Sequence, residues 1–291
     1  MKKIIPLILI FFIQCPFLFS QNGPGGVGNS STLALWLDGE DIALANGAAV
    51  SSWSDKSGNS NDFSAPVGLE PVFASSSNIN SMPGLTFSGS EYLSITSCAD
   101  LDQKPFTWYT VYNTANSSNQ ILLRSSNTGF STTLWGSIQA SSEYRVHGRN
   151  STGGFVAAGT SWSSGSHILY GRWTSVSLGS LDGLSFGSSG GADANPSSGS
   201  HDETRIGSNT PSGGNEFIGD IGEVIVFKDA LNTAQRAIIH NYLSSKYGVA
   251  IDAAEDFYDH DVSYGIDVAG IGRQNSSNQH LTSSGEANVQ I

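Results

Sequence analysis

Cysteine is scarce in this sequence of 291 residues, which contains only Cys15 and Cys98. Cys15 lies in an N-terminal segment that we expect to be removed as a signal peptide, so Cys98 then has no partner in the chain. An intrachain disulfide is therefore excluded for the mature protein. We expect Cys98 to behave as a small buried apolar residue rather than as a reactive thiol. Stability must come from a hydrophobic core, with or without bound metal ions.

Charged residues are also few, at 13% of the chain, and basic residues are the scarcer kind, with 13 Lys and Arg against 25 Asp and Glu. Lys2 and Lys3 lie in the expected signal peptide, and without them 11 basic side chains remain, for a formal net charge of −14. Such an acidic surface argues against nucleic acid or an anionic membrane as partner. It is compatible with neutral glycans and with calcium.

The common catalytic motifs are missing. There is no G-x-S-x-G elbow, no P-loop and no EF-hand loop, and the dense polar cluster at 258–261 lacks the spacing of zinc ligands. The nearest match to the carboxylate strand of a retaining glycoside hydrolase is GEVIVF, in which Glu223 is followed by Ile225 and Phe227 at the alternating positions. We therefore expect no catalytic residues, and keep a glycoside hydrolase as the weaker alternative.

The only long apolar run is at the N-terminus. Two lysines precede apolar residues 4–19, and a polar, Gly-rich stretch follows Ser20. This pattern predicts a signal peptide over residues 1–20 and a secreted, extracellular or cell-surface protein with no transmembrane segment after cleavage. A membrane-spanning helix is the poorer reading, because the run is short and is interrupted by two prolines. A lipoprotein acylated at Cys15 is a further alternative, although the residues before it fit a lipobox poorly.

Glycine is abundant, with 34 residues, and short apolar or alternating segments recur between Gly/Ser/Asn turns. This pattern predicts an all-β sandwich of antiparallel sheets. The expected strands include residues 32–37, 106–112, 121–124, 131–138, 143–147 and 167–173. We also expect a tight pair of strands at 85–87 and 92–95, and a hairpin at 176–186 around Asp182-Gly183.

Residues 217–248 (FIGDIGEVIVFKDALNTAQRAIIHNYLSSKYG) combine a buried strand with the single convincing helix. Asn232 and Gln235 form a capping-box pattern, apolar residues then recur at helical spacing, and Gly248 suits a left-handed stop. We expect this helix to pack on the sandwich. The predicted organisation is a linker at 21–31, a domain at 32–251, and at 252–291 a linker with the start of a second, truncated β module. The alternative for residues 252–291 is a strand pair laid on the first domain.

Four segments of the sequence resemble one family of protein domains. They are LWLDGEDIALANGAAVSSWSDKSGNSND, MPGLTFSGSEYLSI, RIGSN with the strand–helix stretch ending in "KYG", and DVAGIGR. Together they resemble the laminin-G-like, concanavalin A-like jelly-roll domains of secreted multidomain proteins of Bacteroidetes. The resemblance implies a two-sheet antiparallel jelly roll, often with a structural calcium, that serves in glycan binding or adhesion. It also implies that DVAGIGR opens a companion β module. Since one fold hosts many functions, the role in glycan binding or adhesion is an expectation by analogy.

Oxygen-rich groups give the candidate metal ligands, since calcium takes carboxylate, amide and carbonyl oxygens. Asp38 and Asp41 lie close together in the first loop, and Asp220 and Glu223 lie at the edge of the late strand. A further turn at 55–61 carries one Asp and two Asn side chains. We take Asp38, Asp41, Asp220 and Glu223 as candidate ligands of a structural Ca²⁺. For each group the alternative is a solvated or turn-capping side chain.

Aromatic side chains give the candidate ligand-binding residues, because the C–H faces of sugars stack on Trp and Tyr rings. The candidates are Trp162, Trp135, Tyr144 and Trp173, and Trp162 is the strongest because its Gly/Ser surroundings predict a loop. Core packing is the alternative for each. The sequence therefore predicts a lectin-like module that binds a polysaccharide or glycoconjugate or mediates surface adhesion. The alternative is a structural adhesin domain that contacts cell-surface proteins without affinity for glycans.

Overall fold

The computed structural model describes residues 23–96, 98–101, 105–127, 132–140, 143–149, 155–174, 177–189, 201–208, 215–258, 272–273, 275 and 279–280. The expected signal peptide at 1–20 and most of the expected second module lie outside these residues. The fold is an all-β sandwich of two antiparallel sheets with one α-helix late in the chain, as predicted.

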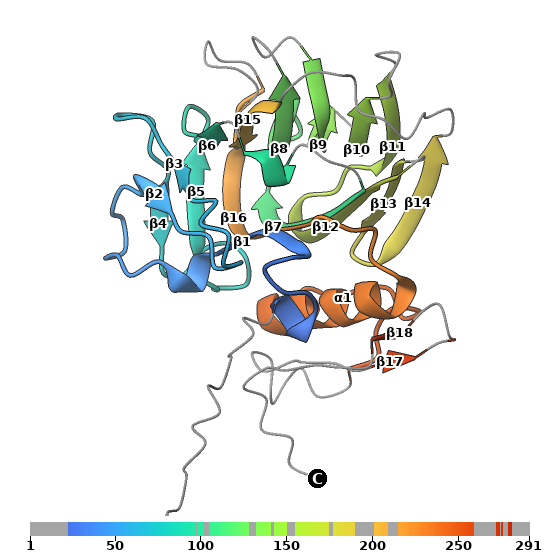
Figure 1. The fold of residues 1–291 in the computed structure, drawn as a ribbon. Coiled ribbons are helices and arrows are strands. Elements are labelled where there is room, and N and C mark those ends of the chain that lie inside the picture. Colours follow the sequence, from blue (N-terminus) through green and yellow to red (C-terminus); the bar gives the residue numbers. More distant parts are fainter. Residues whose placement is uncertain are drawn as a thin grey trace, which may run out of the picture.

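One sheet, which we call the helix-side sheet, has β16 near its centre (Figure 1). Its spatial order is β14 (Leu184–Ser189), β13 (Ser177–Leu181), β12 (Gly165–Trp173), β7 (Phe106–Thr114), β16 (Ile218–Phe227), β5 (Gly84–Ser88) and β4 (Val72–Ala74). β1 (Leu33–Asp38) pairs with the second half of β16, next to the stretch that pairs with β5.

The other sheet, which we call the far sheet, covers the opposite side of the core. Its spatial order is β11 (Phe155–Ser161), β10 (Glu143–Arg149), β9 (Thr132–Ala140), β8 (Gln120–Asn127), β15 (His201–Ile206), β6 (Leu93–Thr96), β3 (Phe63–Ser64) and β2 (Ser52–Trp53). Short 3-10 helices occur at Pro24–Gly26, Gly39–Asp41 and Ala99–Leu101, and the short strands β17 (Gly272–Arg273) and β18 (Gln279–His280) pair with each other.

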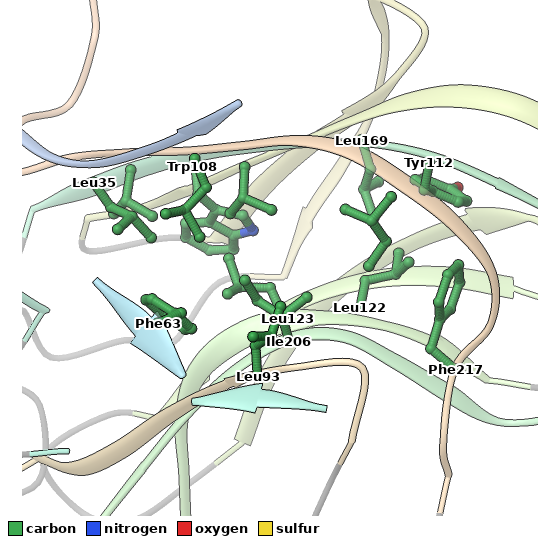
Figure 2. Close-up of a cluster of buried hydrophobic side chains, with 14 of the residues drawn as sticks. Leu35, Phe63, Leu93, Trp108, Tyr112, Leu122, Leu123, Leu169, Ile206 and Phe217 are labelled. Carbon is green, nitrogen blue, oxygen red and sulfur yellow. The ribbon is translucent and has the colours of Figure 1, made fainter. Parts of the chain in front are cut away.

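Apolar side chains from both sheets meet in the space between them. Figure 2 shows Leu35 and Trp108 of the helix-side sheet facing Leu123 and Ile206 of the far sheet. All four are fully buried, and the Trp108 indole also donates a hydrogen bond of 2.7 Å across the core to Ser137 Oγ. Gly171 is paired directly with Trp108, and a Cβ atom there would overlap the Trp108 ring, so this close approach requires glycine.

The helix α1 (Thr233–Tyr247) covers the outer face of the helix-side sheet, so that the molecule has a helix layer on a two-sheet sandwich (Figure 1). Both ends of the helix match the predicted cap and stop. Asn232 and Gln235 form a complete capping box, and Gly248 ends the helix with φ of 61°. Ile239 and Leu243 are fully buried against the apolar outer face of the sheet.

Two local predictions need correction. The expected pair of strands at 85–87 and 92–95 does not form, because β5 belongs to the helix-side sheet and β6 to the far sheet. The Gly/Ser/Thr-rich stretch after residue 148 contains a strand that we did not predict, β11. Within the expected linker at 21–31, Val27 is fully buried and belongs to the same apolar cluster as Ile239 and Leu243 of the helix. The hairpin around Asp182-Gly183 is confirmed as β13–β14.

Candidate functional site

Two of the predicted metal ligands lie side by side at the helix-side sheet. Asp38 on β1 is paired with Glu223 on β16, and both side chains are almost fully buried. The cation between them is a lysine. Lys246 Nζ lies 2.7 Å from Asp38 Oδ2 and 3.0 Å from Glu223 Oε2. An ammonium group from the helix thus stands where the sequence led us to expect a calcium ion.

Hydrogen bonds from other side chains complete this cluster. Glu223 Oε1 accepts from the Trp36 indole at 2.7 Å and from the Tyr242 hydroxyl at 3.1 Å. Asp38 also accepts from Lys56 Nζ at 3.1 Å. Buried carboxylates are tolerated when they are paired and hydrogen-bonded in this way. The cluster therefore joins the helix to two neighbouring strands.

The protonation equilibria follow from this arrangement. Burial raises the pKa of Glu223 above its ordinary value in spite of the adjacent ammonium group. Burial alone would raise the pKa of Asp38 too, but Lys246 and Lys56 lower it. Burial alone would lower the pKa of Lys246, whereas Glu223 and the other groups beside it raise it well above the ordinary value. Lys246 is therefore a fixed cation at neutral pH.

The other two predicted metal ligands also have protein partners. Asp41 accepts from Lys56 Nζ at 2.7 Å. Asp220 is buried and accepts from the backbone and side-chain nitrogens of Asn78 at 2.8 and 2.7 Å and from the Thr86 hydroxyl at 2.5 Å. Among the residues that the structure describes, no group of three or more His, Cys, Asp and Glu side chains is arranged to hold a metal ion.

The four candidate aromatics have different surroundings. Tyr144 and Trp173 are 0% and 1% exposed and pack in the core between the sheets, so neither presents a face to a ligand. For these two the core-packing alternative holds, and the expectation of sugar stacking is corrected. Trp135 pairs with Ser125 and Gly148 within the far sheet, and its side chain lies outside the described part of the structure.

Trp162 is half-buried at the rim of the sandwich, where the chain passes from β11 to β12 and thus from one sheet to the other. It packs against the edge of the core. The serines on either side, Ser161 and Ser163, are exposed, and an ion pair of Glu143 and Arg145 at 2.9 Å lies on the adjoining strand β10. Hydroxyl, carboxylate and guanidinium groups therefore occur on the residues and the strand next to this half-buried indole, whose own N–H is buried without a hydrogen-bond partner among the described residues. Polar groups beside an aromatic ring suit a polar, ring-shaped ligand.

A hollow of about 350 Å³ lies near the start of the domain. It is lined by residues 41–44 and 49 and by residues 51–54. The aromatic side chain in this lining, Trp53, is 1% exposed and donates its indole N–H to the Asp38 carbonyl. The hollow thus offers no aromatic face for stacking.

Our sequence reasoning missed Lys246, although its position gave a usable signal. Lys246 follows Tyr242 and Leu243 by one helical turn, on the face that the apolar residues mark as buried. A lysine on a buried face needs a buried anion, and the acidic candidates on the strands could have been assigned to it.

None of the helices that the structure describes has the length and apolar character needed to cross a membrane.

Comparisons with known proteins support the fold. No protein-family model and no curated protein matches the sequence. Among solved structures, the chain is similar to the botulinum neurotoxin serotype D binding domain, with a TM-score of 0.52 and 8% identity over 72% of this chain and 52% of that chain. It is also similar to the sialidase of Trypanosoma rangeli in complex with sialic acid, with a TM-score of 0.51 and 17% identity over 74% of this chain and 33% of that chain.

The matched region therefore spans about half of the neurotoxin domain and about a third of the sialidase. At these identities the likeness concerns the β-sandwich fold alone.

Proposed function

We propose that this chain is a secreted carbohydrate-binding β-sandwich module that recognises a polysaccharide or glycoconjugate at the rim around Trp162. The position of Trp162 carries the proposal. Of the candidate aromatics whose side chains are described, it is the one that is only half-buried and lies at the rim, whereas Tyr144 and Trp173 are enclosed in the core.

The chemistry around the ring supports a sugar as ligand. The C–H faces of a pyranose stack on an indole, while its hydroxyl groups need donors and acceptors at the edge of the ring. Exposed Ser161 and Ser163 and the Glu143–Arg145 pair supply both kinds of group. Water-exposed groups of this type give weak single contacts, so we expect modest affinity for one sugar unit and a gain from repeated units.

Two further lines of support come from similarity. The sequence resembles laminin-G-like domains, for which glycan binding and adhesion are expected functions. One of the similar solved structures is a sialidase in complex with sialic acid, and another is a neurotoxin binding domain. The expected signal peptide agrees with a protein that meets glycans outside the cell.

A glycan array and polysaccharide pull-downs test the proposal. We expect the wild-type chain to bind at least one glycan, and Trp162→Ala to weaken that binding by at least about tenfold, the equivalent of about 1.4 kcal/mol. Trp162→Phe keeps an aromatic face and is expected to retain most of the affinity. Phe257→Ala removes an aromatic side chain that is 72% exposed elsewhere and is the matched control.

Melting temperatures of the variants separate lost binding from lost folding, because Trp162 also packs on the core. Absence of binding to every polysaccharide tested would contradict the proposal and favour a protein-binding adhesin. Equal losses of glycan affinity in Trp162→Ala and Phe257→Ala would show that the binding site is not at this rim.

A further inference from the structure

Three polar side chains meet beside Trp162 in the order of a nucleophile, a base and an orienting acid. Ser163 Oγ lies 3.1 Å from His167 Nε2, and His167 Nδ1 lies 2.7 Å from Asp182 Oδ2. The serine comes from the turn before β12, the histidine from the start of β12, and the aspartate from the β13–β14 turn. Such a set is recognised by its geometry and not by its order along the chain.

The hydrogen bonds define the state of the imidazole. An ionised carboxylate only accepts hydrogen bonds, so the proton of a neutral His167 ring is on Nδ1, facing Asp182. The lone pair is then on Nε2, facing the Ser163 hydroxyl, which is the tautomer that a general base requires. The other carboxylate oxygen of Asp182 accepts from the Ile168 N–H at 2.8 Å, and this bond holds the aspartate in place.

Packing holds the base and the nucleophile as well. The His167 ring lies against the rings of Tyr112 and Tyr144, with centroids 5.9 and 5.7 Å away. The Tyr144 hydroxyl donates to the Ser163 carbonyl at 2.5 Å. Burial raises the pKa of Tyr144 to about 12, so this hydroxyl remains a donor at neutral pH. The turn that carries Ser163 is therefore anchored from the far sheet.

The arrangement is open to solvent on the serine side. Ser163 and Ser164 are exposed, while the side chains of His167 and Asp182 retain 11% and 24% exposure. Ser164 makes no hydrogen bond within the described ranges, so its backbone N–H, directly after the serine, is free to meet a developing oxyanion. A buried structural serine would offer neither feature.

We propose that Ser163, His167 and Asp182 form an acyl-transfer site that hydrolyses carboxylic esters. Ser163 Oγ attacks the acyl carbon while its proton passes to His167 Nε2, and the carbonyl electron pair moves onto the oxygen that the Ser164 N–H faces. Collapse breaks the bond to the alcohol oxygen, which leaves with the proton from Nε2. Water then gives a proton to Nε2 and attacks the acyl-serine, which releases the carboxylic acid and restores the Ser163 hydroxyl.

A fluorophosphonate probe tests the nucleophile directly, with intact-mass and peptide-mass spectrometry as the readout. We expect one adduct per wild-type chain, located at Ser163, and none in Ser163→Ala. Ser52→Ala removes an exposed serine on β2, at the opposite end of the far sheet from β11, and is expected to be labelled like the wild type. Hydrolysis of p-nitrophenyl acetate should fall in parallel, by at least about 100-fold in His167→Gln.

Asp182→Asn separates a positioning role from a merely structural one. Residue 182 has φ of 50° in a tight turn before Gly183, where asparagine is as suitable as aspartate, so the fold should be kept. The asparagine oxygen can still accept from Ile168, but its amide would donate to His167 Nδ1 and force the ring proton onto Nε2. We expect labelling at least about 100-fold slower with an unchanged melting temperature.

A wild-type chain without an adduct at Ser163 after prolonged exposure to excess probe would overturn the inference. Equal labelling of Ser163→Ala, or of Asp182→Asn, would overturn it as well. Neither probe contains a sugar, so these results are independent of the glycan array. Glycan binding without an adduct would leave the proposed function in place, and an adduct without glycan binding would leave this site in place.

Discussion

Lys246 Nζ, in the last turn of helix α1, lies 2.7 Å from Asp38 Oδ2, and both side chains are 3% exposed. With Glu223 3.0 Å away on the neighbouring strand, this contact ties the helix to β1 and β16. The cluster explains why the helix has a polar group on its buried face, and it accounts for two acidic side chains that are almost fully buried.

Removing this lysine should be costly. Lys246→Met keeps the length of the side chain but leaves Glu223 buried without its cation, while Asp38 keeps Lys56. We expect the free energy of unfolding to fall by about 3–5 kcal/mol, the usual cost of breaking a buried ion pair. Urea unfolding followed by tryptophan fluorescence measures this change.

Lys228→Met is the matched control, because Lys228 pairs with Asp100 at 3.0 Å while both side chains stay partly exposed. We expect it to lower the free energy of unfolding by no more than about 1 kcal/mol. The double variant Lys246→Met with Glu223→Gln should be more stable than Lys246→Met alone, since the stranded charge is gone. Equal losses of unfolding free energy in Lys246→Met and Lys228→Met would show that the buried cluster stabilises the fold no more than an exposed ion pair does.

Calcium should have little effect through the four acidic residues that we first took as ligands. Asp38 and Glu223 face Lys246, Asp41 faces Lys56, and Asp220 accepts hydrogen bonds from Asn78 and Thr86. Melting curves with added calcium or with EDTA should therefore coincide. A clear shift that is abolished by Asp220→Asn would contradict this and restore the metal hypothesis.

The capping box of the helix gives a third prediction. Asn232 Oδ1 accepts from the Gln235 N–H at 3.0 Å, and the Gln235 side chain accepts from the Asn232 N–H at 3.1 Å. Asn232→Ala should lower the free energy of unfolding by about 1 kcal/mol. Asn232→Ser retains a cap acceptor and should be nearly neutral, so similar losses in the two variants would argue against capping as the cause.

Acid should weaken the turn between β5 and β6. Partial burial alone would raise the pKa of Glu91, but hydrogen bonds from Ser88 and Ser90 lower it to about 2 from a usual value of 4.5. A carboxylate with a lowered pKa stabilises the fold above its unfolded pKa, and the contribution is lost as the pH falls from about 4.5 toward about 2.

The variant Glu91→Gln tests this pH dependence. It should be less stable than the wild type at neutral pH, and the difference should shrink across that acid range. Unfolding measured by circular dichroism at several pH values provides the comparison. A constant difference from neutral pH to pH 2 would mean that the charge of Glu91 contributes nothing.

Local patterns predicted those parts of the fold that depend on neighbouring residues. The capped helix, its glycine stop and the Asp182-Gly183 hairpin follow from backbone preferences within a few residues. The assignment of β5 and β6 to different sheets does not follow from such local preferences. The same short turn can connect two strands of one sheet or lead from one sheet to the other. β11 was missed because its sequence, FVAAGTS, is as weakly patterned as the loops around it.

The sequence by itself determined the class of this protein: alternating short apolar segments, abundant glycine and a single capped helix specify a two-sheet sandwich with a helix, because those signals act over a few residues. Only the tertiary structure decided what the polar and aromatic candidates do. Whether a tryptophan is enclosed like Trp173 or accessible like Trp162, and whether Asp38 meets a metal ion or Lys246, depends on residues far away in the chain. Ser163, His167 and Asp182 are nearer to one another in the chain, but whether they meet depends on the pairing of β12 with β13.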